Sequence, residues 1–306
     1  MTLSVSHLTR SFGQRIAVND VSFDVLPGRL TGFVGGNGAG KTTTMRMILG
    51  VLAPDSGEVT LRGIPLDQKA RRSFGYMPEE RGLYPKMGLR EQLVYFAMLH
   101  GFSKADGTKE ADALIEVLGL SERAKDPIEN LSLGNQQRAQ VAVALVHRPT
   151  ALILDEPFSG LDPLAVDVIV SVLSARAAEG IPVLLSSHQL DVVERLCDDL
   201  VIIADGEVRA TGSIDRLRDD YGTLRYRVDG DADLGWIRDV EGVIVTELAG
   251  NTAEIEVADY EVANHVLREA MRLGEVFDFS KQNLKLTEIF REVVVDQADE
   301  KVEVAK

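Results

Sequence analysis

The chain is poor in cysteine and has no long apolar run. Its 306 residues include one cysteine, Cys197, so no intrachain disulfide can form and a reducing compartment fits the sequence. No uninterrupted apolar run approaches the ~20 residues that a helix needs to cross a bilayer. The first stretch, MTLSVSHLTRSFG, lacks an apolar core of signal-peptide length. If the protein works at a membrane, we expect another chain to span it.

Basic residues are also scarce. The chain has 33 Lys and Arg against 48 Asp and Glu, a formal net charge of −15. Proteins that bind nucleic acids usually carry a basic patch, so the acidic balance argues against a long DNA or RNA footprint, and we expect no nucleic-acid partner. The chain is 45% hydrophobic and 26% charged. This composition is typical of a globular protein, and the length allows one large domain and a small one.

Strand and helix patterns alternate over the first 220 residues. Period-two alternation or short apolar runs predict strands at 3–8, 16–26, 30–35, 151–156 and 182–188. The last two suit buried parallel strands. Helical patterns occupy 43–52, 90–102, 109–120 and a run that begins near Ser132. Asp205-Gly206 predicts a hairpin.

The pattern changes near Asp219. From there the predicted order is strand, helix, strand, strand, helix, strand and helix, with the first helix at 233–239 and the last at 286–294. The first six elements resemble a split βαβ sheet. We expect a small α+β domain at 222–297 and a charged, frayed tail at 298–306.

A glycine-rich loop lies between a predicted strand and a predicted helix. GGNGAGKT, from Gly35 to Thr42, matches G-x-x-x-x-G-K-S/T. In this motif backbone N–H groups surround phosphates, Lys41 reaches the β- and γ-phosphates, and the Thr42 hydroxyl is placed to bind Mg²⁺. The alternative is a glycine-rich turn without a ligand, but the flanking strand and helix are the context that the motif requires.

Three further residues lie at the ends of predicted buried strands. Asp155 would hold Mg²⁺, and Glu156 would act as general base toward the γ-phosphate. His188 ends the strand expected beside that of Asp155, from where its ring could hydrogen-bond the γ-phosphate. The alternatives are a solvated turn for the two acids and an ordinary surface or core position for the histidine.

The stretch LSLGNQQR opens a helix. Ser132 is a good N-cap, and a helix N-terminus favours an anion. Taken alone, these residues predict only an ordinary capped surface helix.

Together these motifs resemble the ATP-binding cassette family, the ATPase subunits of ABC transporters, over residues 1–220. GGNGAGKT is similar to Walker A, LSLGNQQR to the signature, ALILDE to Walker B, SGLD (Ser159–Asp162) to the D-loop, and Ser187-His188 to the switch histidine. The resemblance implies an α/β P-loop NTPase cassette with a mainly parallel core sheet, an antiparallel N-terminal sheet and a helical subdomain at about 86–150. It implies ATP and Mg²⁺ as cofactors. The implied nucleotide-binding residues are Phe12, against adenine, and Gly35, Gly36, Asn37, Gly38, Ala39, Gly40, Lys41, Thr42 and Thr43.

The resemblance also implies a head-to-tail dimer, formed by two copies or with a paired ATPase subunit. In such dimers the signature helix completes the partner's phosphate site, here through Ser132, Gly134 and Asn135, with Asp162 in the D-loop. The signature departs from the family's usual Leu-Ser-Gly-Gly-Gln at Leu133 and Asn135. A second departure is Glu79, which stands where the family has a Gln that contacts Mg²⁺ and water, so we place it with Thr42 and Asp155 as a metal ligand.

The family implies a function. The chain is expected to be the cytoplasmic ATP-hydrolysing subunit of an ABC transporter, peripheral on the inner face of the cell membrane, that powers a separate permease for export. The C-terminal piece resembles a small domain appended to some bacterial ABC ATPases of export systems, either a dimer brace or a regulatory ligand site. The alternative functions are a non-transport ABC ATPase that acts on ribosomes or DNA and a scaffold that binds ATP without turnover.

Overall fold

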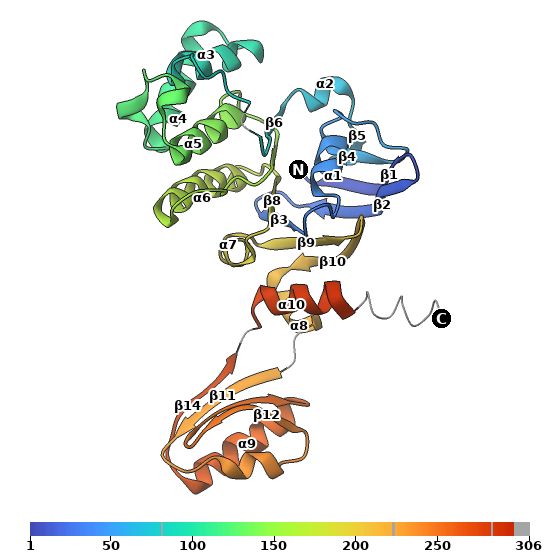
Figure 1. Ribbon diagram of the computed structural model, residues 1–306, viewed down its shortest axis with the longest axis vertical. Helices are drawn as coiled ribbons and strands as arrows, with labels where there is room; N and C mark the ends of the chain where they lie inside the picture. The colour runs from blue at the N-terminus through green and yellow to red at the C-terminus, as the bar shows by residue number, and fades with distance from the viewer. Residues whose placement is uncertain (81, 222–223, 283, 297–306) are drawn as a thin grey trace. The chain divides into compact units, whose positions relative to one another are not determined.

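The computed structural model describes residues 1–80, 82–221, 224–282 and 284–296. The chain forms two compact units, one from Met1 to Ile214 and one from Asp215 onward (Figure 1). The predicted extents of the domains, 1–220 and 222–297, stay predictions, and the expected tail at 298–306 lies outside the described residues.

The first unit contains an antiparallel sheet in the order β2-β1-β4-β5. Its strands are β1 (Leu3–Phe12), β2 (Arg15–Val25), β4 (Ser56–Leu61) and β5 (Ile64–Pro65). β1 and β2 join through a tight turn in which Gly13 has φ 61°, a backbone region that glycine enters without strain. The predicted strands at 3–8 and 16–26 are confirmed, with β1 longer than expected.

The second sheet of this unit has the order β10-β9-β3-β8-β7-β6, and only β10 runs antiparallel to its neighbour. Its strands are β3 (Leu30–Val34), β6 (Phe74–Met77), β7 (Ala151–Leu154), β8 (Val183–Ser187), β9 (Asp199–Ala204) and β10 (Glu207–Ser213). Every residue of β3, β7, β8 and β9 is buried, as expected for parallel strands covered on both faces. The β9–β10 hairpin turns at Asp205 and Gly206 with φ 52° and 78°, which confirms the predicted turn.

Helix α1 (Lys41–Ile48) follows β3 and packs within the main core of the unit. Met45 and Ile48 join Leu8, Val21 and Phe33 in that core. The predicted helix at 43–52 was too long. Gly50 has φ 70°, and the amide of Val51 donates to the Arg46 carbonyl, so a left-handed glycine closes the helix.

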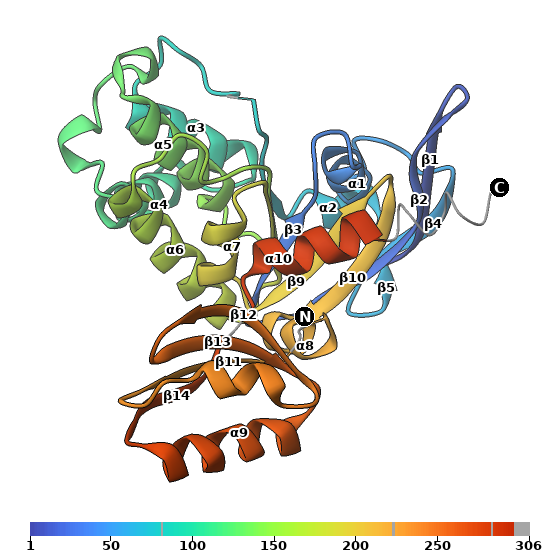
Figure 2. The ribbon, with the colours of Figure 1, turned by 60° about the horizontal axis from the view of Figure 1, so that its bottom comes forward.

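The remaining helices of the first unit lie around the sheets. They are α2 (Gln68–Arg71), α3 (Leu89–Leu99), α4 (Lys104–Val117), α5 (Leu133–Leu145), α6 (Pro163–Ala178) and α7 (Leu190–Leu196). Helix α8 (Ile214–Tyr221) begins at the last residue of the first unit and otherwise belongs to the second. α3, α4 and α5 gather into one group, apart from β1, β2 and β4 (Figures 1 and 2). This group agrees with the implied helical subdomain. Sequence reasoning did not single out β6, α6 or α7.

The second unit has an antiparallel sheet in the order β12-β13-β11-β14, which confirms the split βαβ arrangement. Its main elements are β11 (Leu224–Gly230), β12 (Val243–Ala249), β13 (Thr252–Val257), α9 (Tyr260–Leu273), β14 (Val276–Gln282) and α10 (Leu286–Arg291). Val228, Ile255 and Val266 form its core with α9 on one face of the sheet. The helix predicted at 233–239 is a short 3₁₀ helix, Gly235–Asp239, and a π-helical turn follows α10.

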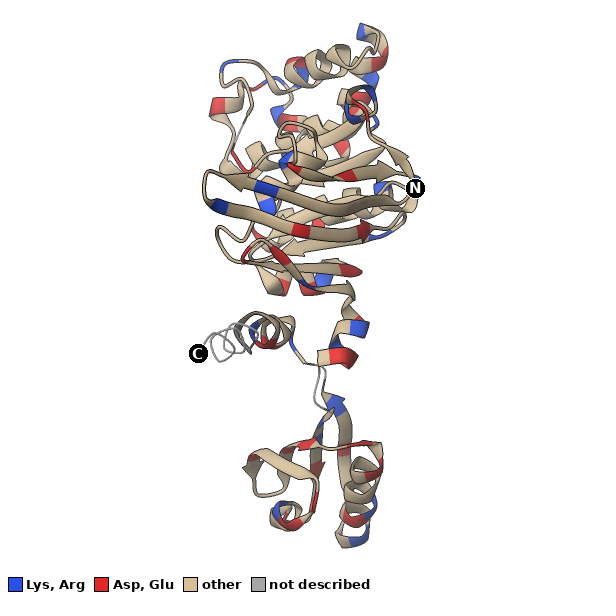
Figure 3. Cartoon of the chain, turned by 90° about the vertical axis from the view of Figure 1, so that its right-hand side faces the viewer, with Lys and Arg blue, Asp and Glu red and all other residues tan. Residues whose placement is uncertain are grey.

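Charged residues are mixed over both units. Figure 3 shows Lys and Arg interspersed with Asp and Glu in that view. Among the described residues, no helix is both long enough and apolar enough to cross a bilayer.

Candidate functional site

The glycine-rich loop between β3 and α1 has a backbone that larger residues could not adopt easily. Gly38 and Gly40 have φ 79° and 109°. A Cβ on Gly40 would lie 2.8 Å from the Ala17 carbonyl oxygen, so the close packing of this loop against β2 requires glycine. The loop leads directly into the N-terminus of α1, where unpaired N–H groups favour an anion.

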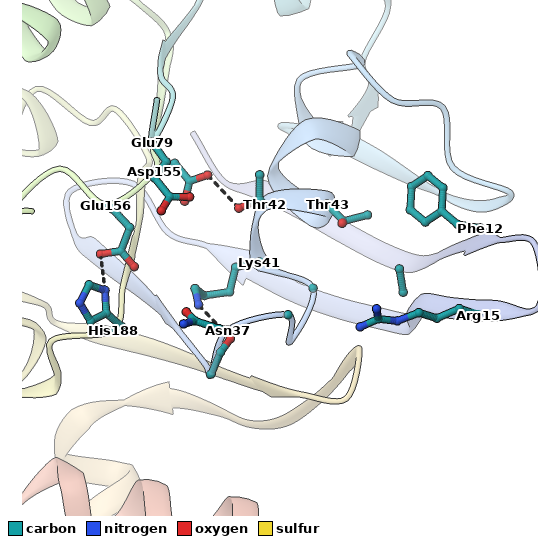
Figure 4. A pocket seen from close by; sticks show the side chains of 14 residues that line it. Phe12, Arg15, Asn37, Lys41, Thr42, Thr43, Glu79, Asp155, Glu156 and His188 are labelled. Carbon is teal, nitrogen blue, oxygen red and sulfur yellow. Dashed lines mark hydrogen bonds and ion pairs between the residues drawn. The ribbon is translucent and has the colours of Figure 1, made fainter. Parts of the chain in front are cut away.

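Lys41 is nearly buried, with 9% of its surface exposed. Its Nζ donates to the carbonyls of Gly35, at 2.6 Å, and Gly36, at 3.2 Å (Figure 4). A buried ammonium must be hydrogen-bonded, and here its own loop supplies the acceptors. The ammonium therefore lies at the loop where phosphate oxygens would bind.

Asp155 connects this loop to the strands of the core sheet. Its Oδ2 accepts a hydrogen bond from Thr42 Oγ1 at 3.0 Å, and its Oδ1 accepts one from Ser186 Oγ at 2.5 Å. Burial, and next the Asp155 carboxylate, raise the pKa of Tyr76 on β6 above its ordinary value. Glu79 lines the same pocket. A hydroxyl and two carboxylates are the hard oxygen donors that Mg²⁺ prefers, so the residues present fit this cation.

Glu156 adopts an uncommon backbone conformation, with φ 53°. Its amide donates to Ser186 Oγ at 2.9 Å, and its Oε2 lies 2.9 Å from His188 Nδ1 (Figure 4). Because β7 and β8 are parallel neighbours, their carboxyl ends bring Glu156 and His188 to one edge of the sheet, as predicted. A neutral ring that donates from Nδ1 has only an acceptor at Nε2. His188 can then donate to a phosphate oxygen only as an imidazolium or after it leaves Glu156.

These side chains surround a pocket of about 560 Å³. Its lining includes Phe12, Arg15, Ala17, Gly36, Asn37, Gly38, Gly40, Lys41, Thr42, Thr43, Glu79, Asp155, Glu156 and His188. Of the residues predicted around the nucleotide, Gly35 and Ala39 do not line it and are buried in the loop behind. Phe12 is 50% exposed at this pocket, so it is not a core aromatic.

Sequence reasoning missed several residues of the site. Arg15 and Ala17 line the pocket, and their position in TRSFGQRIAV, a few residues after Phe12, was the available signal. Ser186 bridges Asp155 and Glu156 from the next strand. That contact depends on strand register, which the local sequence does not encode.

The signature and D-loop residues do not line this pocket. Ser132 caps α5 by accepting from the Asn135 amide at 3.3 Å, and Leu133 is exposed. A Cβ on Gly134 would lie 3.4 Å from Leu161 Cδ2. Asp162 accepts from the Ala165 amide at 2.9 Å and caps α6. Within this chain these residues are helix caps and their neighbours.

Comparisons with known proteins agree with the geometry. The family model described as "ABC transporter" matches residues 18–159, and the model of the C-terminal domain of DrrA1-3-like ATP-binding proteins matches residues 212–294. The chain is similar to the uncharacterised ABC transporter ATP-binding protein YhaQ of Bacillus subtilis, with 35% identity over 292 residues, 95% of this chain and 98% of the relative. It is also similar to the Nod factor export ATP-binding protein I of Paraburkholderia xenovorans, with 39% identity over 207 residues, 67% of this chain and 68% of the relative.

A solved structure supports the same assignment. The ATP-binding subunit of an ABC transporter is 35% identical, covers 72% of this chain and 94% of its own length, and superimposes with a TM-score of 0.67. A solved cassette of a bacterial ABC transporter, MJ0796, is dimeric, and the similar cbiO1 from Clostridium perfringens is part of the ABC transporter complex cbiONQ. Because its similarity to a family member extends over 95% of its length, the chain belongs to the ABC transporter ATP-binding proteins, the subunits that bind and hydrolyse ATP.

Proposed function

We propose that the pocket binds ATP with Mg²⁺, that the signature helix of a second subunit completes it, and that ATP turnover drives a separate permease for export. The observation that carries this proposal is the connected set of contacts beside the glycine-rich loop: Thr42 and Ser186 hold Asp155, Ser186 also holds the Glu156 amide, and Glu156 pairs with His188.

The roles in binding follow from the positions of the side chains. The exposed ring of Phe12 offers a stacking surface for adenine. The loop amides and Lys41 bind the phosphates. Thr42, Asp155 and Glu79 would hold Mg²⁺, which would neutralise charge on the β- and γ-phosphates when bound.

Hydrolysis needs a base that accepts a proton from the attacking water. Glu156 is 8% exposed and lies beside Asp155 at the end of β7, which suits a general base next to the metal site. His188 holds the Glu156 carboxylate at 2.9 Å and would donate to the γ-phosphate once released. Catalysis would come from positioning and charge, because no covalent intermediate is required.

A second subunit would supply the residues that are absent from the pocket. α5 is 13 residues long and starts at a capped, exposed end, with Leu133 58% exposed. In a head-to-tail dimer Ser132, Gly134 and Asn135 of each subunit would contact the γ-phosphate held by the other. The second subunit is a copy of this chain or a paired ATPase.

A permease would bind the helical subdomain. Tyr84, Tyr95 and Phe96 form an aromatic group with ring centroids 5.7–6.2 Å apart, and Tyr84 is half exposed, so the group offers apolar area to a partner. The permease would hold the chain on the inner face of the membrane. The export direction is supported by the relative named for Nod factor export.

Mixing two inactive variants tests the shared site. Lys41→Ala removes the cation that holds the phosphates, and Ser132→Arg blocks the end of α5. In a mixed dimer both lesions fall in one site and the other site is intact. With Glu156→Gln in both chains to prevent turnover, mixing before ATP is added should restore trapping of one nucleotide per mixed dimer. If mixed dimers form but trap no more ATP than either parent, the signature helix does not act across the dimer.

A further inference from the structure

The peptide that carries Glu156 is in a doubly unfavourable conformation. Glu156 has φ 53°, which strains any residue other than glycine. It also precedes Pro157, whose ring restricts the backbone of the residue before it. Such a conformation persists only where neighbouring groups hold it.

The two ends of the Glu156 residue are held from different elements. Its amide donates to Ser186 Oγ on β8 at 2.9 Å. Its carbonyl accepts from Gln137 Nε2 at 3.0 Å, and the same Nε2 lies 3.1 Å from the Pro157 carbonyl oxygen. Gln137 is 4% exposed, so its amide bonds without competition from bulk water. The Glu156 carbonyl also accepts from the Ser159 amide at 3.2 Å.

Neighbouring glutamines on α5 hold other segments. Gln136 Nε2 donates to the carbonyls of Ile128 and Leu131, at 3.1 and 3.0 Å, in the segment before the helix. Gln140 Nε2 lies 3.5 Å from the carbonyls of Pro78 and Glu80. Gln137, between these two, donates instead to the backbone of Glu156 and Pro157.

We propose that Gln137 is a positioning residue for ATP hydrolysis, which holds the Glu156–Pro157 backbone so that the Glu156 carboxylate faces the pocket. This inference rests on the proposed role of Glu156 as general base. Gln137 acts through the backbone of Glu156, whereas the water and phosphates would contact the carboxylate itself. A small displacement of a catalytic group can lower the rate strongly.

The position of Gln137 has a second consequence. It lies five residues after Ser132 on the same helix, about 7.5 Å along the axis at 1.5 Å per residue. Any ligand that moves the exposed end of α5 therefore moves the amide that holds Glu156. In the proposed dimer, a γ-phosphate bound to Ser132 in one site would be linked through α5 and Gln137 to the base of the other site.

The test is Gln137→Met in the full chain, with Gln137→Leu as a second variant if the first does not fold. Methionine keeps the length of the side chain and its helix propensity but cannot donate. We expect kcat to fall about 10- to 100-fold, while the ATP concentration for half-maximal rate changes by less than about twofold. The thermal unfolding midpoint should change by only a few degrees.

Gln137→Met in a Glu156→Gln background distinguishes an effect that acts through Glu156 from an effect on the whole protein. If Gln137 acts only through the base, it should not lower the residual hydrolysis further, and ATP trapping should persist. Wild-type kcat in Gln137→Met, or an equal fall in both backgrounds, would overturn the inference. If Glu156→Gln itself turns over ATP normally, the proposed general base is wrong instead.

Gln136→Met is the matched control. It removes the same kind of bridging amide one position earlier on α5, one that donates to the carbonyls of Ile128 and Leu131. We expect Gln136→Met to lower kcat less than Gln137→Met does. We also expect Gln136→Met to lower the rate by the same factor in the Glu156→Gln background as in the wild type. An equal or larger fall in kcat for Gln136→Met would show that any lost amide on α5 is enough, and would overturn the specific role of Gln137.

Discussion

The two units of the chain differ in how much charge they bury and in how many of their residues have a strained backbone. The first buries Lys41, Asp155 and Glu156 beside one pocket. All six non-glycine residues with positive φ among the described residues, Glu156 included, also lie in it. The second unit has an apolar core around Val228 and Ile255, and no charged residue is buried in its described part.

This contrast indicates where the chemistry of the chain lies. Buried charge and strained backbone are unfavourable unless neighbouring groups hold them, and they gather at functional sites for that reason. In the second unit, buried residues alternate along β13, and Asp259 caps α9. The absence of buried charged residues and of strained backbone from its described part favours a structural role for this unit over a catalytic one.

Among the first three predictions, the largest effect on ATP turnover is expected from a change at Glu79. If this carboxylate binds Mg²⁺ and water, Glu79→Ala should lower ATP turnover about tenfold and raise the Mg²⁺ concentration needed. Glu79→Gln keeps an oxygen ligand and the family's usual residue, so it should retain activity. Hydrolysis rates measured over a Mg²⁺ titration decide this. An Ala variant with unchanged rate and Mg²⁺ dependence would remove Glu79 from the site.

A second prediction concerns acid sensitivity in the first unit. His147 stacks on His100 with ring centroids 3.7 Å apart, and its Nε2 lies 3.2 Å from the Phe74 carbonyl oxygen. Burial, and next the charge of His100, lower the pKa of His147 to about 4. The unfolded chain, with an ordinary pKa of about 6.5, binds a proton first as pH falls. The stabilisation is therefore complete above pH ~6.5 and is lost toward pH ~4.

Between pH 7 and pH 5 this histidine should reduce the free energy of unfolding by about 2 kcal/mol. His147→Gln keeps a donor for the Phe74 carbonyl but does not titrate, so it should lose less stability over the same range. Urea unfolding of both proteins at the two pH values measures the difference. Equal losses would show that the histidine pair has no part in the acid response.

The smallest effect on the nucleotide site is expected from damage to the second unit. Ile255 is fully buried, and Ile255→Ala should destabilise that unit by about 2–5 kcal/mol. ATP affinity should stay within about twofold if the site belongs to the first unit alone. Limited proteolysis measures the destabilisation of the second unit, and nucleotide binding on the same protein measures ATP affinity. If ATP affinity fell together with the stability of the second unit, nucleotide binding would not belong to the first unit alone.

Sequence patterns predicted much of the fold and site because they are local. GGNGAGKT carries its own turn geometry, and the residues after β7 and β8 meet because parallel strands share an edge. The helix at 43–52 was too long because an isolated glycine is tolerated in a helix pattern, whereas Gly50 closes α1 in the left-handed region.

Contacts between distant segments could not be predicted in this way. Ser186 and Gln137 reach the Glu156 backbone from residues 30 and 19 positions away. Neither residue type indicates such a partner, because serine and glutamine are common on surfaces. The positive φ of Glu156 is likewise a product of tertiary packing.

Glu156→Gln tests the central claim, that the pocket in the first unit hydrolyses ATP with Glu156 as base, most directly. Glutamine keeps the size and hydrogen bonding of the side chain but cannot accept the proton. ATP hydrolysis should fall by ~10²-fold or more, while ATP binding persists and nucleotide-bound dimers accumulate. Hydrolysis and binding measured on the same preparation separate the two. Turnover within a few-fold of the wild type would contradict the account.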